Sequence, residues 1–379
     1  MTNKSCVVFV INSIRLGGAE RALVNILGQT HLQEGLDVHV LLLDNEPMAR
    51  ELPSHVRLTI LDCKGSTLKS IKGINDYIKK TKPSVVVSFL VRANLSNAIV
   101  KLFAKKHKAL LFERMHLTSH LNNQFSGLKR HVAGLLPKIF YRFADAVVGV
   151  SNGVTVDLVE NYSVASDKAH TIFNPYDLKF ISKKSAIEPE FELPDSFIIS
   201  TGRLTPAKNF KLLIDAYLKS DESAHLCILG DGEQKQELLD YIYQQNASNK
   251  VTLLGYAENP FSILVRAKYY ISASNNEGFP NALVEAMAIG LPAIMTNCPS
   301  GPAEILAADV NFHSDKVHIA KYGILAPLDN RVELTHAINL FQNEALRKEY
   351  KAMSLKRAKD FHIDKVVEQY WSFIRTQLE

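Results

Sequence analysis

The sequence predicts an α/β protein built from two doubly wound domains. Short apolar runs alternate with helical patterns along all 379 residues, and each half begins with an apolar run that meets a glycine and then a helix. Alternating strands and helices indicate a mainly parallel sheet. A chain of this length exceeds the usual size of a single core, so we expect one such sheet in each of two domains.

The domain boundaries follow from composition. Residues 1–180 are expected to form the first domain, with the C-terminal helix at 362–379 joining it. Residues 181–196 are charged, contain proline and have no period of their own, which indicates a linker. Residues 197–361 then form the second domain.

The first domain begins with Val7–Asn12, a continuous apolar run typical of a strand covered on both faces. The run leads to Gly17 and Gly18, which open a helical pattern. They form either a simple tight turn or a loop whose amides approach a phosphate or a sugar. We expect further strands at 37–43, 56–61, 84–90, 109–113, 146–150 and 170–173, and helices at 68–80, 93–106, 128–144 and from 151.

Polar residues follow the strand at 109–113, where Arg114, Met115 and His116 come next. Open α/β sheets bind ligands at the carboxyl ends of their strands. His116 is therefore a base, a donor to a substrate oxygen, or an ordinary surface imidazole. The helix at 128–144 is basic, amphipathic and interrupted by Pro137, which fits a core helix whose outer face is solvated or lies on a membrane.

The second domain repeats the plan, with a strand at 197–201 that leads to a loop carrying Arg203 and Lys208. The two cations are either ordinary surface residues or a pair that holds a diphosphate. Gly230 and Gly232 supply only part of a dinucleotide fingerprint, which is therefore absent. Further strands are expected at 224–229, 251–255, 269–273, 291–295 and 323–326, followed by helices from Arg331, the last with Trp371 on its apolar side.

The stretch 274–287 carries two acids eight positions apart, Glu277 and Glu285. The residues that follow Glu277 favour a turn, and Asn281 is expected to cap a helix there. Glu285 then lies about one turn inside that helix, whose N-terminus favours phosphate. The alternative is a pair of solvated acids near a helix start. The residues in question are Glu277, Gly278, Phe279, Pro280, Asn281 and Glu285.

The net charge of +5 is unevenly distributed, because residues 64–142 hold 16 basic residues and only two acids, Asp76 and Glu113. Such a region favours an anionic surface or substrate, or serves as a solubilising face. Nucleic acid is not expected, because interleaved aromatics and known binding motifs are lacking. Anionic lipid headgroups or a phosphate-bearing acceptor fit better.

We expect a cytoplasmic protein, in contact with the inner face of the cell membrane through residues 64–142. The N-terminal stretch leads directly into a strand without a signal-peptide pattern, and no apolar run reaches about 18 residues. Four scattered cysteines, Cys6, Cys63, Cys227 and Cys298, indicate reduced thiols and neither a zinc site nor a disulfide framework.

Three segments together carry a resemblance to a known family: LGGAERALVNI from Leu16, GRLTPAKNFKLLIDAY from Gly202, and EGFPNALVEAMAIGLPAI from Glu277. In this order they closely resemble family 4 of the retaining glycosyltransferases, and the likeness extends to SNGV at Ser151. The resemblance implies the GT-B fold, with two Rossmann-like domains facing a cleft. It also implies an acceptor-side first domain, a donor-binding second domain, and no cofactor or metal.

The resemblance implies a role for each matching residue. Glu277 faces the donor sugar and Glu285 binds the donor ribose, Arg203 and Lys208 hold the diphosphate, and Gly17 and Gly18 close over the donor phosphates. His116 lies near a family histidine, although Glu113, Arg114 and Met115 intervene between it and the strand. The partners implied are a nucleotide-sugar, with UDP foremost, and a glycan or lipid-linked acceptor.

The residues agree with front-side transfer that retains configuration. Arg203, Lys208 and the helix N-terminus would stabilise the departing diphosphate electrostatically. The sequence contains no Asp-x-Asp pair to hold a metal diphosphate. A hexosyl- or N-acetylhexosaminyl-transferase for bacterial surface polysaccharide or lipopolysaccharide is the leading hypothesis. The alternatives are a sugar-nucleotide epimerase or phosphorylase on the same fold, and a non-catalytic sugar-nucleotide or glycan-binding subunit.

Overall fold

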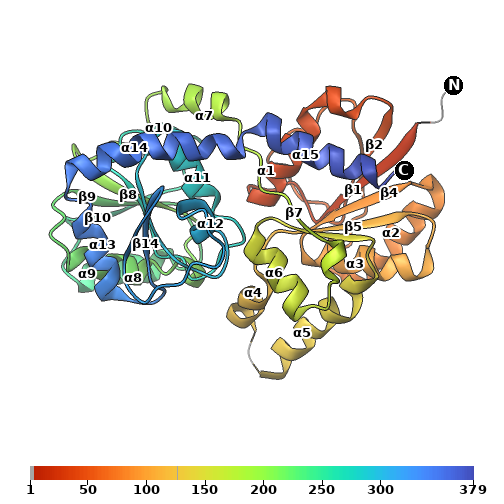
Figure 1. The fold of residues 1–379 in the computed structure, drawn as a ribbon, viewed down its shortest axis with the longest axis horizontal. Helices are drawn as coiled ribbons and strands as arrows, with labels where there is room; N and C mark the ends of the chain where they lie inside the picture. Colours follow the sequence, from red (N-terminus) through yellow and green to blue (C-terminus); the bar gives the residue numbers. More distant parts are fainter. Residues whose placement is uncertain (1–3, 126) are drawn as a thin grey trace. The chain divides into compact units, whose positions relative to one another are not determined.

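The computed structural model describes residues 4–125 and 127–379, leaving aside the side chains of Leu128 and Val132. The chain forms two compact units (Figure 1). The first unit extends to Pro175 and takes back the chain from Ile363 onwards, and the second unit is Tyr176–His362. The membrane-facing interpretation of the helix at 128–144 depended partly on Leu128 and Val132, and those two side chains lie outside the description.

The first unit contains, in its described part, a parallel sheet of seven strands in the order β3-β2-β1-β4-β5-β6-β7. Every strand expected from the sequence of this domain is present, with shifts of one or two residues at the ends. The strands are β1 Ser5–Ile11, β2 Leu36–Leu42, β3 Arg57–Ile60, β4 Val85–Phe89, β5 Lys108–Glu113, β6 Ala146–Gly149 and β7 Ala169–Thr171.

Helices cover both faces of this sheet. Alternate residues of β1 point to opposite faces, so Phe9 packs in a cluster with the last helix while Val10 packs in a cluster with Ile74 and Val100. The helices are α1 Gly18–Gly28, α2 Thr67–Thr81, α3 Val91–Phe103, α4 Leu117–Gln124, α5 Gly127–Phe140, α6 Asn152–Asn161 and α15 Ile363–Thr376, with short 3-10 turns at Thr30–Gln33, Tyr141–Phe143 and Ser166–Lys168.

The C-terminal helix α15 belongs to the first unit, as its apolar side suggested. Trp371 is buried, donates to the Ile26 carbonyl over 3.0 Å and packs edge-on against Phe9 at 5.6 Å. One expectation for this unit was wrong, because α5 continues through Pro137. A proline in the last turn of a helix removes only one backbone hydrogen bond, so the helix need not end there.

The second unit contains a second sheet of seven described strands, in the order β10-β9-β8-β11-β12-β14-β13. All neighbours are parallel except β13, which forms an antiparallel edge with β14. The sequence did not indicate β13, because it has only three residues, of which Ile319 is exposed and only Ala320 is buried. The strands are β8 Phe197–Thr201, β9 His225–Leu229, β10 Val251–Gly255, β11 Tyr270–Ser272, β12 Ala293–Thr296, β13 His318–Ala320 and β14 Gly323–Ala326.

The stretch expected to be a linker, 181–196, begins inside helix α7 and lies in the second unit. Ile181 is buried, and Phe180 packs edge-on against Phe261 of the neighbouring helix. Charged residues around these two apolar side chains hid the helix. The helices of this unit are α7 Leu178–Ser185, α8 Phe210–Leu218, α9 Lys235–Gln244, α10 Pro260–Leu264, α11 Asn281–Ala288, α12 Pro302–Leu306, α13 Arg331–Leu340 and α14 Glu344–Ala358, with 3-10 turns at Pro206–Lys208 and Lys359–Phe361.

Candidate active site

The second sheet has a topological switch point between β8 and β11. The chain goes from β8 to β9 on one side, and β11 pairs with β8 on the other. Loops that follow such a pair of strands diverge and leave a binding position at the carboxyl edge. Here the two loops are joined directly, since the Asn275 amide donates to the Ala207 carbonyl over 2.8 Å and the Asn209 side chain donates to Asn275 over 3.1 Å.

Lys208 and Glu277 form an ion pair at this switch point. Lys208 ends the 3-10 turn after β8, and Glu277 lies in the loop after β11. Their side chains are 24% and 12% exposed, so the pair is largely withdrawn from water but still reachable from it. The structure therefore brings together two residues that the sequence places 69 positions apart.

Arg203 is the third residue expected in this place, and it lies on the same loop as Lys208. Its side chain is exposed and makes no ion pair with any described residue. Backbone hydrogen bonds fix this loop, because the amides of Gly202 and Leu204 donate to the carbonyls of Leu229 and Asp231, both over 3.0 Å. A guanidinium on a fixed backbone and without an ion-pair partner in the described chain is available to an anionic ligand.

Gly230 supports this loop in a way that the sequence did not reveal. It has φ +147°, and a Cβ atom there would lie 1.9 Å from the Gly202 carbonyl oxygen. Gly232 is similarly confined, since its Cβ would lie 2.4 Å from the Leu204 carbonyl oxygen. The turn at Gly230 and Gly232, which lacks the full dinucleotide fingerprint, therefore has a structural role: it lets the Arg203 loop approach the end of β9.

The turn from Gly278 to Pro280 is buried and leads into α11. Asn281 was expected to cap this helix, but that expectation was wrong: the helix begins at Asn281, Pro280 occupies the capping position, and no side chain caps the end. Instead, the Asn281 side-chain oxygen accepts a hydrogen bond from the Tyr176 hydroxyl. The position of Glu285 one turn inside α11 is as expected.

Glu285 is buried on α11, with 6% of its surface exposed. Its charge and that of Glu277 both act on the Tyr270 hydroxyl. Burial raises the pKa of the Tyr270 hydroxyl, and Glu277 and, more weakly, Glu285 add to that effect. Both carboxylates therefore influence one tyrosine, the first residue of β11.

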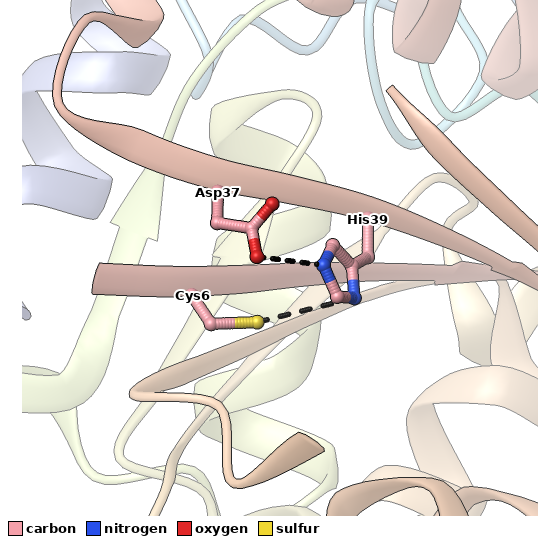
Figure 2. A group of neighbouring side chains, drawn as sticks. All are labelled: Cys6, Asp37 and His39. Carbon is pink, nitrogen blue, oxygen red and sulfur yellow. Dashed lines mark hydrogen bonds and ion pairs between the residues drawn. The ribbon is translucent and has the colours of Figure 1, made fainter. Parts of the chain in front are cut away.

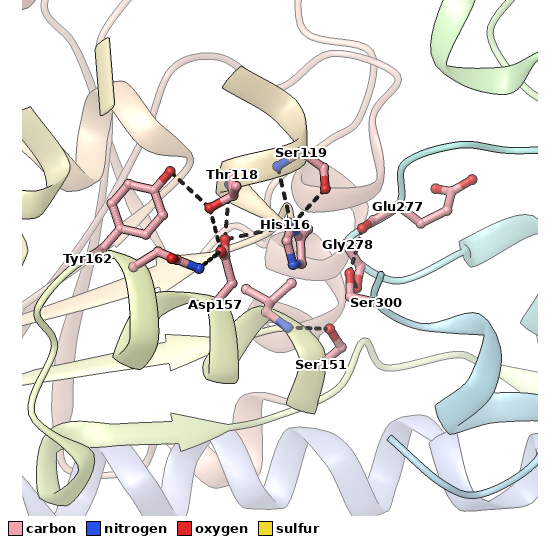
Figure 3. A network of polar contacts seen from close by, with 11 residues as sticks. His116, Thr118, Ser119, Ser151, Asp157, Tyr162, Glu277, Gly278 and Ser300 are labelled. Atoms are coloured by element: carbon pink, nitrogen blue, oxygen red, sulfur yellow. Dashed lines mark hydrogen bonds and ion pairs between the residues drawn. The ribbon is translucent and has the colours of Figure 1, made fainter. Parts of the chain in front are cut away.

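Ser300 is a site residue that the sequence analysis missed. It follows β12, the strand next to β11, and its hydroxyl donates to the Glu277 carbonyl at 2.6 Å, with the Gly278 carbonyl at 3.3 Å (Figure 3). Next to it, Gly301 has φ +96°, and a Cβ there would lie 2.4 Å from Pro280. The only signal was the Pro-Ser-Gly turn after a predicted strand.

Tyr176 and Phe361, also missed, lie next to the two points where the chain passes between the units. The Tyr176 amide donates to the Phe361 carbonyl over 3.0 Å, and the two rings flank Phe279 at centroid distances of 6.5 Å and 5.2 Å. With the hydroxyl contact to Asn281, these residues hold the turn before α11. No sequence pattern linked Tyr176 to a turn about a hundred positions later.

The first sheet has its own switch point, between β1 and β4. Gly17 follows β1 as the capping residue of α1, and its carbonyl accepts the Arg21 amide over 3.1 Å. Its φ of −119° is ordinary extended backbone. Gly17 and Gly18 therefore lie at the position where a phosphate-binding loop is expected, without a strained backbone.

His116 lies at the first turn of α4, near the carboxyl end of β5. Its Nδ1 atom accepts a hydrogen bond from the Ser119 amide at 3.3 Å and lies 2.9 Å from the Ser119 hydroxyl (Figure 3). The buried Asp157 carboxylate is 3.7 Å from Nδ1 and accepts from both the amide and the hydroxyl of Thr118, at 3.0 Å and 2.5 Å. With 14% of its side chain exposed, His116 is not an ordinary surface imidazole.

These contacts determine the proton position on His116. Burial lowers the pKa of its imidazole, and the weaker attraction of Asp157 only partly offsets this. The ring is therefore neutral near pH 7. Because a backbone amide can only donate, Nδ1 must be the acceptor and Nε2 carries the hydrogen. His116 thus presents a hydrogen-bond donor, which favours one of the three roles left open by the sequence.

Glu113, the last residue of β5, and Arg114, which follows it, have structural roles. Arg114 points into the core of the first unit, where it donates to the Tyr370 hydroxyl over 2.8 Å and to the Asn174 side chain, and lies over Phe89. Glu113 is fully buried and accepts from the Tyr141 hydroxyl over 3.0 Å, and burial raises the pKa of its carboxyl. Of the polar residues after this strand, His116 is the candidate for substrate contact.

One group of described side chains has the composition of a metal site. Cys6, Asp37 and His39 lie near the amino ends of β1 and β2 (Figure 2). The His39 Nδ1 atom lies 2.9 Å from the Tyr77 hydroxyl, and the Asp37 carboxylate lies 3.1 Å from Nε2 without a hydrogen bond. Burial, followed by Asp37, raises the pKa of the Cys6 thiol to about 11. A protonated thiol and an occupied imidazole fit a polar cluster better than a metal site.

None of the helices within the described ranges is long and apolar enough to cross a bilayer.

Comparison with known families gives matches to both units. Residues 16–180 match the model described as Glycosyltransferase Family 4, and residues 182–353 match the model described as Glycosyl transferases group 1. The two matches meet close to the boundary between the two units.

Two relatives from Campylobacter jejuni are similar along almost the whole chain. The N-acetylgalactosamine-N,N'-diacetylbacillosaminyl-diphospho-undecaprenol 4-alpha-N-acetylgalactosaminyltransferase is 31% identical over 368 residues, which cover 94% of this chain and 95% of that protein. The enzyme named GalNAc-alpha-(1->4)-GalNAc-alpha-(1->3)-diNAcBac-PP-undecaprenol alpha-1,4-N-acetyl-D-galactosaminyltransferase is 26% identical and covers 97% of each chain.

Among solved structures, HepE of Anabaena in complex with UDP has a TM-score of 0.77 at 19% identity, covering 98% of this chain and 99% of that one. The likeness confirms the predicted two-domain fold.

Proposed function

This chain belongs to the glycosyltransferases, and we propose that it moves a sugar from a nucleotide-sugar, UDP-sugar foremost, with retention of configuration and without a metal ion. The observation that carries the proposal is the Lys208–Glu277 pair at the switch point of the second sheet. There, an ammonium and a carboxylate held together offer one partner to a diphosphate and one to a sugar hydroxyl.

In the proposal, Arg203 and Lys208 bind the diphosphate and neutralise its charge as it departs. Arg203 has no ion-pair partner among the described residues, and Lys208 has only Glu277. Preorganised cations at the point where negative charge develops often contribute more to catalysis than any other single effect. They supply the charge that a metal ion would otherwise provide.

Further residues of each unit have a role in the proposal. Glu277 accepts hydrogen bonds from the sugar hydroxyls, and Glu285 accepts them from the ribose. The turn Gly278-Phe279-Pro280-Asn281 leads the backbone amides of α11 towards the phosphates, and Gly17 and Gly18 offer theirs at the end of β1. His116 donates its Nε2 hydrogen to a substrate oxygen, in agreement with the contacts at Nδ1.

The acceptor in this proposal is a glycan or a lipid-linked glycan, and the transferred group is a hexose or an N-acetylhexosamine. The names of the two Campylobacter relatives, which act on undecaprenol-linked substrates, support this class. We place the protein in the cytoplasm, at the inner face of the membrane, with residues 64–142 facing anionic lipid.

The decisive experiment is the substitution Lys208→Ala, assayed with a panel of UDP-sugars. Removing one charge-stabilising group of this type is expected to lower kcat by about 10²–10³-fold. Lys211→Ala is the matched control, because Lys211 also pairs with a glutamate, Glu237, at 2.6 Å but on exposed helical surface. Transfer rates within about twofold of wild type are expected for the control, since exposed ion pairs contribute little. A Lys208→Ala enzyme as active as the control would refute the assignment.

Two further readouts test the chemistry of transfer. The anomeric proton of the product, followed by NMR, should show the configuration of the donor, and chelation with EDTA should leave the rate unchanged. An inverted product would rule out retention, and a rate abolished by EDTA and restored by Mg²⁺ would rule out metal independence. Conversion of UDP-sugar in the absence of acceptor would instead indicate an epimerase.

A further inference from the structure

A groove of about 1100 Å³ runs along one face of α2 and reaches the end of α3. Its apolar lining includes Leu68, Ile71, Val100 and Phe103. Leu68 and Phe103 are 79% and 78% exposed, although both are large and apolar. Two large apolar side chains exposed beside one hollow indicate a contact surface rather than ordinary solvent exposure.

Lysines frame this groove. None of them makes an ion pair with a described residue, and the lining contains no acid. Lys101, on α3 but outside the lining, behaves differently, because Asp145 neutralises it at 2.8 Å. The groove therefore presents uncompensated positive charge around an apolar floor. The lysines of the lining are Lys72, Lys79, Lys82, Lys105 and Lys106.

His107 also lines the groove, and it is 1% exposed. Neither of its ring nitrogens has a hydrogen-bond partner in the described part of the chain. Burial, followed by the nearby Lys101, lowers the pKa of this imidazole to about 4, so the ring is neutral. His107 therefore adds no charge to the groove, whose positive charge comes from its lysines.

We propose that this groove docks on the surface of an anionic phospholipid bilayer. Leu68 and Phe103 insert among the acyl chains, and the lysines lie against the headgroup phosphates. Lysine is a compact, mobile point charge, which suits a fluid array of phosphates better than one fixed geometry. The inference rests on the membrane contact proposed above for residues 64–142 and narrows that contact to α2 and the end of α3, so that α5 lies outside it.

A rival surface lies in the same basic region, on α5. This helix carries Lys129 and Arg130, and its Leu135 and Leu136 are 51% and 40% exposed. The lining of the groove along α2 includes no residue of α5. The two surfaces can be tested against each other, since their charges lie on different helices.

Flotation of the full chain with vesicles distinguishes them. We expect binding to phosphatidylglycerol-containing vesicles at low salt, little binding to pure phosphatidylcholine, and release at about 0.5 M salt because of screening. The double variant Lys79→Glu/Lys106→Glu should lower the partition coefficient at least about tenfold, since each lysine near such a surface contributes several-fold. Phe103→Ser should lower it severalfold, and Lys129→Glu/Arg130→Glu should change it less than twofold.

The proposal is overturned if the protein does not bind the anionic vesicles, if the α2–α3 variants bind like wild type, or if only the α5 variant loses binding. Vesicle binding that an acidic peptide alone displaces would indicate a protein partner instead. UDP-induced stabilisation and transfer to a soluble acceptor, measured on the same variants, should remain unchanged. A wild-type protein that binds vesicles but does not transfer sugar would contradict the proposed function and leave this inference standing.

Discussion

The first five strands of the two sheets follow the same order, with β8 in the second unit standing where β1 stands in the first, and the sheets differ at the far edge, where β14-β13 replaces β6-β7. Their carboxyl edges nevertheless differ. In the second sheet the loops after β8, β9, β11 and β12 are in direct contact through backbone hydrogen bonds and side-chain contacts. In the first sheet, a glycine loop of ordinary conformation follows β1 and a partly buried, neutral histidine follows β5.

This comparison teaches that the fold repeats while the chemistry does not. The second edge holds paired charges on a tightly supported backbone, as a diphosphate site requires. The first edge offers backbone amides and one neutral imidazole donor, and the residues assigned to it carry no side-chain charge. Three substitutions test how far that difference extends.

The largest effect is expected at the glycines after β9. In Gly230→Ala, the new methyl would meet the Gly202 carbonyl at 1.9 Å and would require an unfavourable φ, so we expect a loss of about 3 kcal/mol in the free energy of unfolding. Gly17→Ala is the matched change on the first edge. Its methyl would meet only the end of the flexible Glu20 side chain, and a loss below about 1 kcal/mol is expected. Urea denaturation measures both, and equal losses would contradict the comparison.

The next largest effect concerns the donor on the first edge. His116→Ala should lower kcat about a hundredfold, as loss of one well-placed hydrogen-bond donor does, and should leave UDP binding unchanged. His120→Ala, on the same helix α4, is the control and should retain activity. If His120→Ala is as impaired as His116→Ala, the effect comes from the helix and not from the imidazole.

The pH dependence sharpens this assignment. Because burial lowers the pKa of His116, its ring stays neutral while the pH falls through the ordinary value of 6.5. The rate of transfer should therefore show no loss from His116 between pH 8 and pH 6.5. Below pH 6.5 the unfolded chain binds the proton first, so this residue makes the protein less stable as the pH falls. A rate that declines with an apparent pKa at or above 7, and does so only when His116 is present, would contradict the neutral-donor role.

The smallest effect is expected from Tyr176→Phe. This change removes the hydroxyl that donates to Asn281 but keeps the ring beside Phe279. One neutral hydrogen bond contributes about 1 kcal/mol, so KM for the donor should rise about fivefold with little change in kcat. Tyr243→Phe, on exposed surface of α9 in the same unit, is the control. An unchanged KM in Tyr176→Phe would show that the turn before α11 holds its shape without this bond.

Most of the fold could be predicted because the inner strands are continuous apolar runs such as VVFVI and FIIST. The omissions are short or polar elements, including β13, α10 and α12, whose patterns are too brief to show a period. The helix within the expected linker was hidden for a related reason. Ile181 is buried and Phe180 packs against Phe261, but charged residues surround them in the sequence.

The residues of the candidate site were also predicted only in part. Glu277, Glu285, Arg203 and Lys208 were identified from local motifs, each contained in a single loop or helix. Their supports were not, because Gly230, Ser300 and Tyr176 act on loops that belong to other strands. A contact of this kind has no period and no local spacing, so only the folded chain reveals it.

The sequence by itself determined the order of strands and helices, the doubly wound class, and the side chains that carry charge at the ends of β8 and β11, since these depend on local hydrophobicity and on short motifs. The tertiary structure decided that Lys208 pairs with Glu277, that Gly230 makes room for the Arg203 loop, and that His116 presents its Nε2 hydrogen. These three features depend on contacts between residues far apart in the sequence or on burial. Such contacts and burial exist only once the sheets have formed.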